Sequence, residues 1–334
     1  MDGRGAHAMT GATEERARLD VAVGVLGALA QREVPLGPHT TYRVGGPAAL
    51  FVRAESEDDV ARVGRAASAS GLPVLVVGRG SNLLVADAGF VGVALALGSF
   101  AGGMAVEPRP GGGGDVVAGG AVSLPVLARQ SVAAGLTGLE WAVGVPGSVG
   151  GGVRMNAGGH GSDVAGTLVG VRAFDLRSGE HGAVPASALA LRFRGSDLGG
   201  DQVVLSARFR LEHGDRARSE RELAEIVRWR RDHQPGGQNA GSVFVNPVPG
   251  QVSAGELIDA LGLRGLRIGT AEVSTKHANF IQADAGGRAD DVRALMAEVR
   301  RRVLEATGYA LRSEIRQIGF EDVDDGVRDR ELAP

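Results

Sequence analysis

The segment from Gly144 to Gly161 constrains this chain more than any other and reads G-V-P-G-S-V-G-G-G-V-R-M-N-A-G-G-H-G. Glycine dominates it, so it adds little to a core, but its backbone can adopt φ > 0 and approach a ligand closely. Successive N–H groups in such turns form anion-binding concavities. A flexible surface loop is the plain alternative. Polar residues interrupt the glycines and favour a binding site; they are Ser148, Arg154, Asn156 and His160.

Composition limits the class of protein. The 334 residues are enough for two or three domains, and 43% hydrophobic residues supply a substantial core. A net charge of −3 without a long basic run argues against a nucleic-acid-binding protein. The absence of cysteine excludes disulfides and thiolate metal sites, and we expect no metal. Without a long apolar stretch or a signal-peptide core, we expect a cytoplasmic protein that does not enter a membrane.

Periodicity and capping residues predict the elements. Ser56 predicts the N-cap of a helix that ends at Gly71, and V-L-V-V after Pro73 predicts a buried strand; with the strand at 49–53 they form a β-α-β unit. Residues 1–18 and 321–334 are expected to be disordered tails. Further helices are expected at 19–30, 124–134, 219–231, 253–261 and 289–307. Further strands are expected at 164–174, 201–211 and 311–318, with a short strand or turn at 241–246.

A second glycine-rich loop, Gly78-Arg79-Gly80-Ser81-Asn82, follows the strand after Pro73. It does not fit the dinucleotide fingerprint, because Leu83 stands where the third glycine belongs, and an ordinary turn is the alternative. Two such loops in one chain favour a long pyrophosphate ligand. Arginine, histidine or backbone N–H groups would have to hold it, because Lys276 is the only lysine.

Polar residues in the second half of the chain are ambiguous by themselves. Ser242 lacks the flanking glycines of a nucleophile elbow, so a turn serine is the plain interpretation. In a strand at 311–318 three charged residues would share one face, either as a solvated edge or as a charge-organised pocket; they are Arg312, Glu314 and Arg316. His233 and His277 lack metal-ligand spacing.

Seven segments together resemble, in order, the UDP-N-acetylenolpyruvoylglucosamine reductase family. They are T-T-Y-R-V-G-G, V-G-R-G-S-N-L-L, the segment from Gly144 to Gly161, R-F-R-G-S, Q-P-G-G-Q-N-A-G-S-V-F-V-N-P, A-E-V-S-T-K-H-A-N-F-I and L-R-S-E-I-R-Q-I-G. The resemblance covers roughly residues 19–320. The 48-residue spacing from Arg194 to Ser242 resembles the shorter branch, which lacks a substrate-clamping loop.

The resemblance implies an α+β protein, with an FAD-binding fold of the vanillyl-alcohol-oxidase/p-cresol-methylhydroxylase type and a C-terminal α/β substrate domain. The expected boundaries are 19–95 and 96–213 for the two FAD-binding subdomains and 214–310 for the substrate domain. Residues 311–320 would form a catalytic strand that returns to the FAD unit. The protein is expected to be a monomer.

The implied activity is the NADPH-dependent, FAD-mediated reduction of UDP-N-acetylglucosamine enolpyruvate to UDP-N-acetylmuramate, a peptidoglycan precursor. The resemblance implies that Arg194 stabilises the negative charge that develops on the substrate carboxylate. It also implies that Ser242 donates the proton and that Glu314 is the catalytic glutamate. We expect a raised pKa for Glu314, because it would lie beside the substrate carboxylate.

The resemblance also assigns binding residues. The implied FAD-binding residues are Gly78, Arg79, Gly80, Ser81, Asn82, Leu83, Gly144, Val145, Pro146, Gly147, Ser148, Gly150, Gly151, Asn156, Gly158, Gly161 and Arg316. The implied substrate-binding residues are Arg230, His233, Asn246 and His277.

Some positions depart from the family pattern. His160 and Phe193 stand where the family often has tyrosine, and Val245 and His233 where it often has lysine. These departures put substrate contacts in question more than the reaction. Two other functions remain open: a sugar or alcohol oxidase that uses O₂ on the same fold, and a sugar-nucleotide-binding regulator without turnover.

Overall fold

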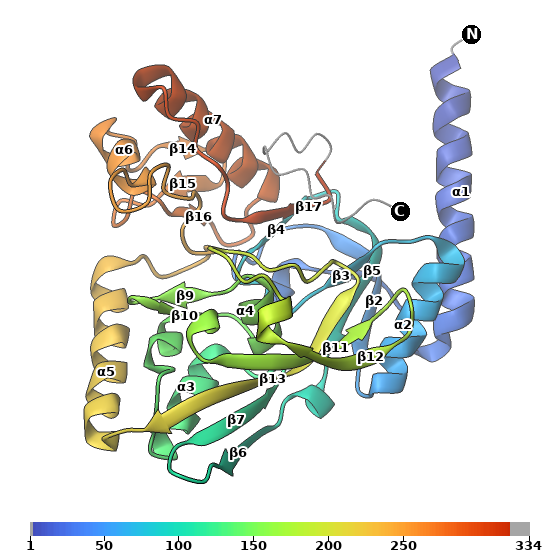
Figure 1. Cartoon of the computed structure of the whole chain (residues 1–334). Helices are drawn as coiled ribbons and strands as arrows, with labels where there is room; N and C mark the ends of the chain where they lie inside the picture. Colours follow the sequence, from blue (N-terminus) through green and yellow to red (C-terminus); the bar gives the residue numbers. More distant parts are fainter. Residues whose placement is uncertain (1–2, 321–334) are drawn as a thin grey trace.

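The computed structural model describes residues 3–320. Its first sheet has the strand order β1-β2-β5-β3, in which β2 and β3 both run parallel to β5, as the expected β-α-β unit requires (Figure 1). Helices α1 (Gly3–Leu26) and α2 (Glu57–Ser70) pack together beside this sheet. The strands are β1 (Gln31–Pro35), β2 (Pro47–Ala54), β3 (Val74–Val76) and β5 (Phe90–Leu97).

The second sheet is antiparallel, in the order β12-β11-β13-β7-β6, with β8 paired to the end of β13. One face buries the hydrophobic core that it shares with α3 (Leu124–Ala133), α4 (Val149–Arg154) and α5 (Arg216–His233). The strands are β6 (Met104–Pro108), β7 (Gly114–Gly119), β8 (Leu136–Thr137), β11 (Leu168–Asp175), β12 (His181–Pro185) and β13 (Gln202–His213).

The C-terminal part forms a further core around α7 (Ala289–Thr307) and α6 (Ala254–Ala260), to which Tyr42, Val44 and Leu84 also contribute. Its three-stranded antiparallel sheet consists of β14 (Arg267–Ile268), β15 (Ala271–Val273) and β16 (Ile281–Ala283). The chain then returns, and β17 (Arg316–Ile318) pairs in parallel with β4 (Leu83–Val85), next to the first sheet (Figure 1).

Short elements complete the fold. A two-stranded hairpin joins β9 (Gly158–Gly159) to β10 (Ser162–Asp163). The 3₁₀ helices are η1 (Gly27–Leu29), η2 (Gly37–His39), η3 (Ser99–Ala101), η4 (Glu140–Gly144), η5 (Val164–Gly166) and η6 (Ala186–Ala188).

Capping residues set the ends of α2 as expected. The Ser56 hydroxyl accepts the N–H of Asp59 at 3.2 Å, and Gly71 ends the helix in the left-handed region at φ 67°. The helix over 289–307 is confirmed with these bounds.

Two expectations about elements were wrong. Residues 3–18 are not a tail but belong to α1, and the Arg18 guanidinium donates to the backbone oxygens of Ser70 and Gly71 at the end of α2. This long-range contact leaves no periodic signature in the sequence. The strand over 311–318 is confined to 316–318, where β4 offers a partner. Residues 1–2 and the expected tail at 321–334 lie outside the described residues.

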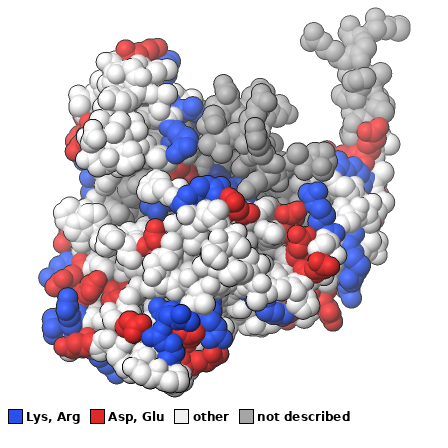
Figure 2. Space-filling model, viewed as in Figure 1, with Lys and Arg blue, Asp and Glu red and all other residues white. Residues whose placement is uncertain are grey.

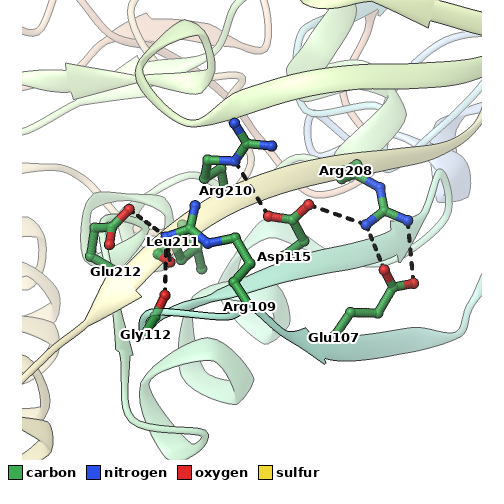
Figure 3. A network of polar contacts seen from close by, with 8 residues as sticks. All are labelled: Glu107, Arg109, Gly112, Asp115, Arg208, Arg210, Leu211 and Glu212. Carbon is green, nitrogen blue, oxygen red and sulfur yellow. Dashed lines mark hydrogen bonds and ion pairs between the residues drawn. The ribbon is translucent and has the colours of Figure 1, made fainter.

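A polar network joins β6, β7 and β13 of the second sheet (Figure 3). Asp115 on β7 bridges Arg208 and Arg210 on β13, at 3.2 and 3.5 Å, and Glu107 on β6 also binds Arg208. Strand-crossing pairs of opposite charge stabilise an exposed sheet face. Both signs of charge are mixed over the face of the molecule in Figure 2.

Candidate functional site

A cavity of about 1060 Å³ opens where the two sheets and the C-terminal part meet. Its walls include both glycine-rich loops and all three residues expected to be catalytic, Arg194, Ser242 and Glu314. Of the residues expected to bind FAD, fifteen line it: Gly78, Arg79, Gly80, Ser81, Asn82, Leu83, Gly144, Val145, Pro146, Gly147, Ser148, Gly150, Gly151, Gly158 and Arg316.

The first loop, residues 78–82, exposes its backbone to the cavity. Within residues 3–320, none of its five N–H groups donates to an acceptor of the chain. Gly80 has φ 58°, and a Cβ there would lie 2.2 Å from the backbone oxygen of His39. Only glycine therefore fits this turn, and the loop presents free donors suited to an anion.

The second loop lies against the first. Ser148 is 3% exposed and its hydroxyl caps α4 by accepting the N–H of Gly151 at 3.3 Å. A Cβ on Gly78 would lie 2.4 Å from that hydroxyl oxygen. Gly144, at the start of this loop, is in turn covered by Ile226 and Arg230 of α5. The absence of side chains at Gly78 and Gly144 thus lets three segments meet at one wall.

Arg194 and Glu314 form an ion pair at the cavity wall. Nε of Arg194 lies 2.5 Å from Oε1 of Glu314, and the two side chains are 29% and 15% exposed. Burial raises the pKa of Glu314, and the neighbouring guanidinium only partly opposes this. The expected direction of the shift is present, but its cause in the protein alone is desolvation.

Local backbone geometry aims these side chains. Arg194 adopts φ 56° in a tight turn closed by the backbone pair Arg192–Gly195. The N–H of Glu314 donates to the backbone oxygen of Val243 at 2.8 Å. The Asn82 amide donates to the backbone oxygen of Glu314 at 3.1 Å. Neither the turn nor these contacts have a sequence signature.

The ionisable side chains that line the cavity are mostly positive. Glu314 is the only carboxylate among the described residues that line the cavity, against six arginines: Arg53, Arg79, Arg154, Arg194, Arg230 and Arg316. Desolvation lowers the pKa of Arg230, whose Nε donates to the Gln234 amide oxygen at 2.8 Å. A half-buried guanidinium facing a cavity without a carboxylate nearby suits a phosphate-bearing ligand.

The structure does not bring five expected binding residues to the cavity wall. The buried Asn156 amide is used inside the protein: it donates to Asp163 Oδ2 and the Arg192 oxygen and accepts the N–H of Ala165. His233 stacks on Trp229 with ring centroids 4.8 Å apart. The others are Gly161, Asn246 and His277.

Three positions that depart from the family pattern have local contacts. His160 meets the Trp229 ring edge-on at 5.1 Å. The exposed Phe193 ring lies 5.0 Å below the Arg194 guanidinium carbon. The N–H of Val245 donates to the backbone oxygen of Arg312 at 2.9 Å.

Sequence reasoning missed some cavity residues, including Arg53 and Asn239. Arg53 lies near the carboxyl end of β2, which begins the β-α-β unit, and ligands commonly bind at that end of parallel strands. This position was a usable signal, whereas none marked Asn239.

Two other kinds of site are absent from the described residues. Among the described helices, none combines the length and apolar character needed to cross a membrane. Over residues 3–320 there is also no group of three or more His, Cys, Asp or Glu side chains able to hold a metal ion.

The chain is similar to known proteins over most of its length. Residues 233–318 match the family model of the UDP-N-acetylenolpyruvoylglucosamine reductase C-terminal domain, and residues 48–181 match an FAD binding domain. The UDP-N-acetylenolpyruvoylglucosamine reductase of Heliobacterium modesticaldum is 43% identical over 290 residues, which cover 86% of this chain and 90% of the relative. That of Synechococcus sp. strain CC9311 is 41% identical over 304 residues, covering 88% and 95%.

A solved structure agrees. The UDP-N-acetylenolpyruvylglucosamine reductase from Thermus caldophilus superimposes with a TM-score of 0.72 at 34% identity, covering 86% of this chain and 98% of that one. These matches confirm the expected α+β architecture and FAD as the cofactor. The chain therefore belongs to the UDP-N-acetylenolpyruvoylglucosamine reductase family.

Proposed function

We propose that this protein reduces UDP-N-acetylglucosamine enolpyruvate to UDP-N-acetylmuramate, with NADPH as the reductant. The observation that carries the proposal is the convergence of Arg194, Ser242 and Glu314 on the same cavity as two glycine loops, in a chain of the reductase family. The same convergence disfavours a regulator without turnover.

The residues present fit FAD. Five N–H groups at 78–82 have no acceptor within residues 3–320, and Gly78 and Gly147 line the cavity without side chains. This wall suits the pyrophosphate, with Arg316 close by. The bound cofactor supplies a hydride relay from NADPH to C3 of the enolpyruvyl group. The protein's part is to bind and orient the partners and to handle charge and protons.

Arg194 would hold the enolpyruvyl carboxylate, into which negative charge moves as C3 gains hydride. A planar guanidinium is permanently charged and donates in a fixed fork, so it stabilises this charge without reorganising. Its ion pair with Glu314 keeps the guanidinium aimed at the cavity.

Ser242 would deliver the proton to C2. A serine hydroxyl is a weak acid, but a positioned donor contributes roughly 10²–10⁴-fold against a strongly basic carbanion. Burial raises the pKa of Glu314, which would favour its taking up a proton when the substrate carboxylate binds beside it.

Arg230 would bind the uridine diphosphate, because its guanidinium lies partly buried at the cavity wall, where desolvation lowers its pKa. Contacts from His233, Asn246 and His277 stay predictions, since these side chains would have to reach the substrate from outside the cavity wall.

The test is an anaerobic titration of the purified protein. NADPH should bleach the flavin absorbance, and UDP-N-acetylglucosamine enolpyruvate should restore it with formation of UDP-N-acetylmuramate. A protein that takes up no FAD refutes the cofactor assignment. Rapid reoxidation by O₂ with no response to the enolpyruvyl substrate would identify an oxidase.

Ser242→Ala separates the two halves of the reaction. Bleaching by NADPH should be unchanged and recovery with substrate should slow by at least 100-fold. Ser253→Ala is the control, because it removes the N-cap of α6 without touching the cavity. If Ser242→Ala slowed both half-reactions equally, this result would contradict the proton-donor role of Ser242.

Three expectations extend the proposal beyond the site: the protein is cytoplasmic, acts as a monomer and binds no nucleic acid. Sedimentation at several protein concentrations tests the monomeric state. A molecular mass that rises with concentration would contradict it.

A further inference from the structure

The side chain of Asn279 pairs with the backbone of Phe244 in the way a neighbouring strand would. Its Oδ1 accepts the N–H of Phe244 at 3.0 Å, and its Nδ2 donates to the Phe244 oxygen at 2.8 Å. The backbone oxygen of Asn279 also accepts the N–H of Val243 at 2.9 Å. Both Asn279 and Phe244 are buried, at 5% and 2% exposure. Three hydrogen bonds therefore fix the two residues that follow Ser242.

The segment held in this way also holds Glu314. The oxygen of Val243 accepts the N–H of Glu314 at 2.8 Å, and the N–H of Val245 donates to Arg312 at 2.9 Å. One hydrogen-bonded path thus runs from Asn279 through residues 243–245 to residues 312–314. It joins the backbones that carry the serine hydroxyl and the carboxylate.

Asn279 is itself well anchored. Its N–H donates to Nδ1 of His277 at 3.2 Å, and β16 begins two residues later. Asn279 is not among the residues that line the cavity, so it has no contact with the reacting atoms. Its influence on the site must pass through the backbone of residues 243–245.

We propose that Asn279 is a positioning residue that sets the Ser242 hydroxyl relative to Glu314. The proposal rests on the function proposed above. An apolar side chain at 279 leaves the N–H and oxygen of Phe244 buried without partners, and the segment shifts to satisfy them. A displacement of about 1 Å at a reacting group lowers the rate by roughly 100-fold.

The test compares both half-reactions in Asn279→Leu by stopped flow. Flavin reduction by NADPH should stay within about 3-fold of wild type. Reoxidation by UDP-N-acetylglucosamine enolpyruvate should slow by roughly 10- to 100-fold at saturating substrate, with the substrate Kd little changed. Asn279→Asp keeps the acceptor for the Phe244 N–H and loses the donor at neutral pH. Its rate of reoxidation by substrate should therefore lie between those of wild type and Asn279→Leu. This second variant serves if Asn279→Leu does not fold.

Thr270→Val is the matched control in the same part of the chain. It removes the 2.7 Å hydrogen bond from Thr270 to Asp291 and leaves residues 243–245 untouched. It should lower the melting temperature and leave both half-reactions at the wild-type rate. Equal slowing of both half-reactions in the Asn279 variants, or no slowing, overturns the positioning role. If wild type itself fails to reoxidise with the enolpyruvyl substrate, the proposed function falls, and this inference with it.

Discussion

Nε of Arg194 lies 2.5 Å from Oε1 of Glu314, and this pair joins a tight turn after β12 to the segment before β17. The two residues are 120 positions apart in the chain. The guanidinium therefore restrains the largely buried carboxylate, and under the proposed function it would have a second task as the cation available to a substrate carboxylate.

Arg194→Lys should separate these tasks. A lysine ammonium keeps the charge but loses the fork of donors, so it cannot hold Glu314 and a substrate carboxylate in one plane. We expect flavin reduction by NADPH to be preserved and reoxidation by substrate to slow roughly 100-fold, as for the loss of a preorganised donor. Arg192→Lys, which changes an exposed arginine paired with Asp197, is the control and should react normally. An unimpaired Arg194→Lys would show that charge alone suffices.

The raised pKa of Glu314 predicts a pH-dependent stability difference. A carboxyl with a raised pKa contributes stability that is fully present below its unfolded pKa of 4.5 and is lost as pH rises through the folded pKa. Glu314→Gln avoids that loss. The variant should therefore melt higher than wild type at pH 8, with a smaller difference near pH 5, although it should be a poor catalyst.

Glu57→Gln is the control of opposite sign. Hydrogen bonding to Arg172 lowers the pKa of Glu57, so its stabilising effect is present above pH 4.5 and is lost as pH falls through the folded pKa. This variant should melt lower than wild type at pH 8, with the gap closing in acid. A Glu314→Gln protein that melts below wild type at pH 8 would mean that the Arg194 attraction outweighs burial.

Gly78→Ala should weaken FAD binding. The added methyl would lie 2.4 Å from the Ser148 hydroxyl, so the side chain that caps α4 must move and the wall between the loops must widen. We expect the FAD dissociation constant, measured by fluorescence quenching, to rise at least 10-fold. Gly159→Ala, in the other glycine-rich segment, is the control, because no atom lies within 4 Å of the added Cβ. Equal affinity of the two variants would contradict a tight cradle at Gly78.

Local signals explain which elements were predictable. Helix α2 has a serine N-cap, acids in its first turn and a left-handed glycine after its last, and α7 combines a strong apolar stripe with a glycine end. These features act within a few residues, so they can be seen in the sequence. The strand at 311–318 was overextended because only 316–318 meet β4, and such a partner is invisible locally.

The site was predictable in a different way. Composition and spacing predicted two anion-binding loops, whereas the resemblance implied the three residues that are proposed to be catalytic. Neither showed that Asn156 is used inside the protein or that Asn279 holds Phe244, because both depend on pairings of distant backbone groups. Sequence patterns record which groups are present, but the acceptor that a buried amide finds is decided by tertiary packing.

The N-terminus of α7 is capped by a residue that is distant in the sequence. Arg288 occupies its N-cap position without a capping side chain. The carboxylate of Asp87, just after β4, instead accepts the N–H groups of Ala289 and Asp290 at 2.9 and 3.2 Å. Asp87 thus satisfies free helix donors and places a negative charge at the positive end of the helix dipole. It also ties α7 to the strand that pairs with β17.

Asp87→Ala should lower the free energy of unfolding by about 1 kcal/mol, the usual effect of losing an N-cap. Urea unfolding followed by circular dichroism measures this loss. The apparent affinity for the enolpyruvyl substrate should also fall by a few fold, since the C-terminal part carries Ser242 and Asp87 links it to β4. Asp290→Ala is the control: its exposed carboxylate pairs at the surface with Arg288, so the change should stay within about 0.5 kcal/mol. If the two variants lose the same stability, the Asp87 carboxylate acts only as another surface charge, and the link between α7 and β4 contributes nothing.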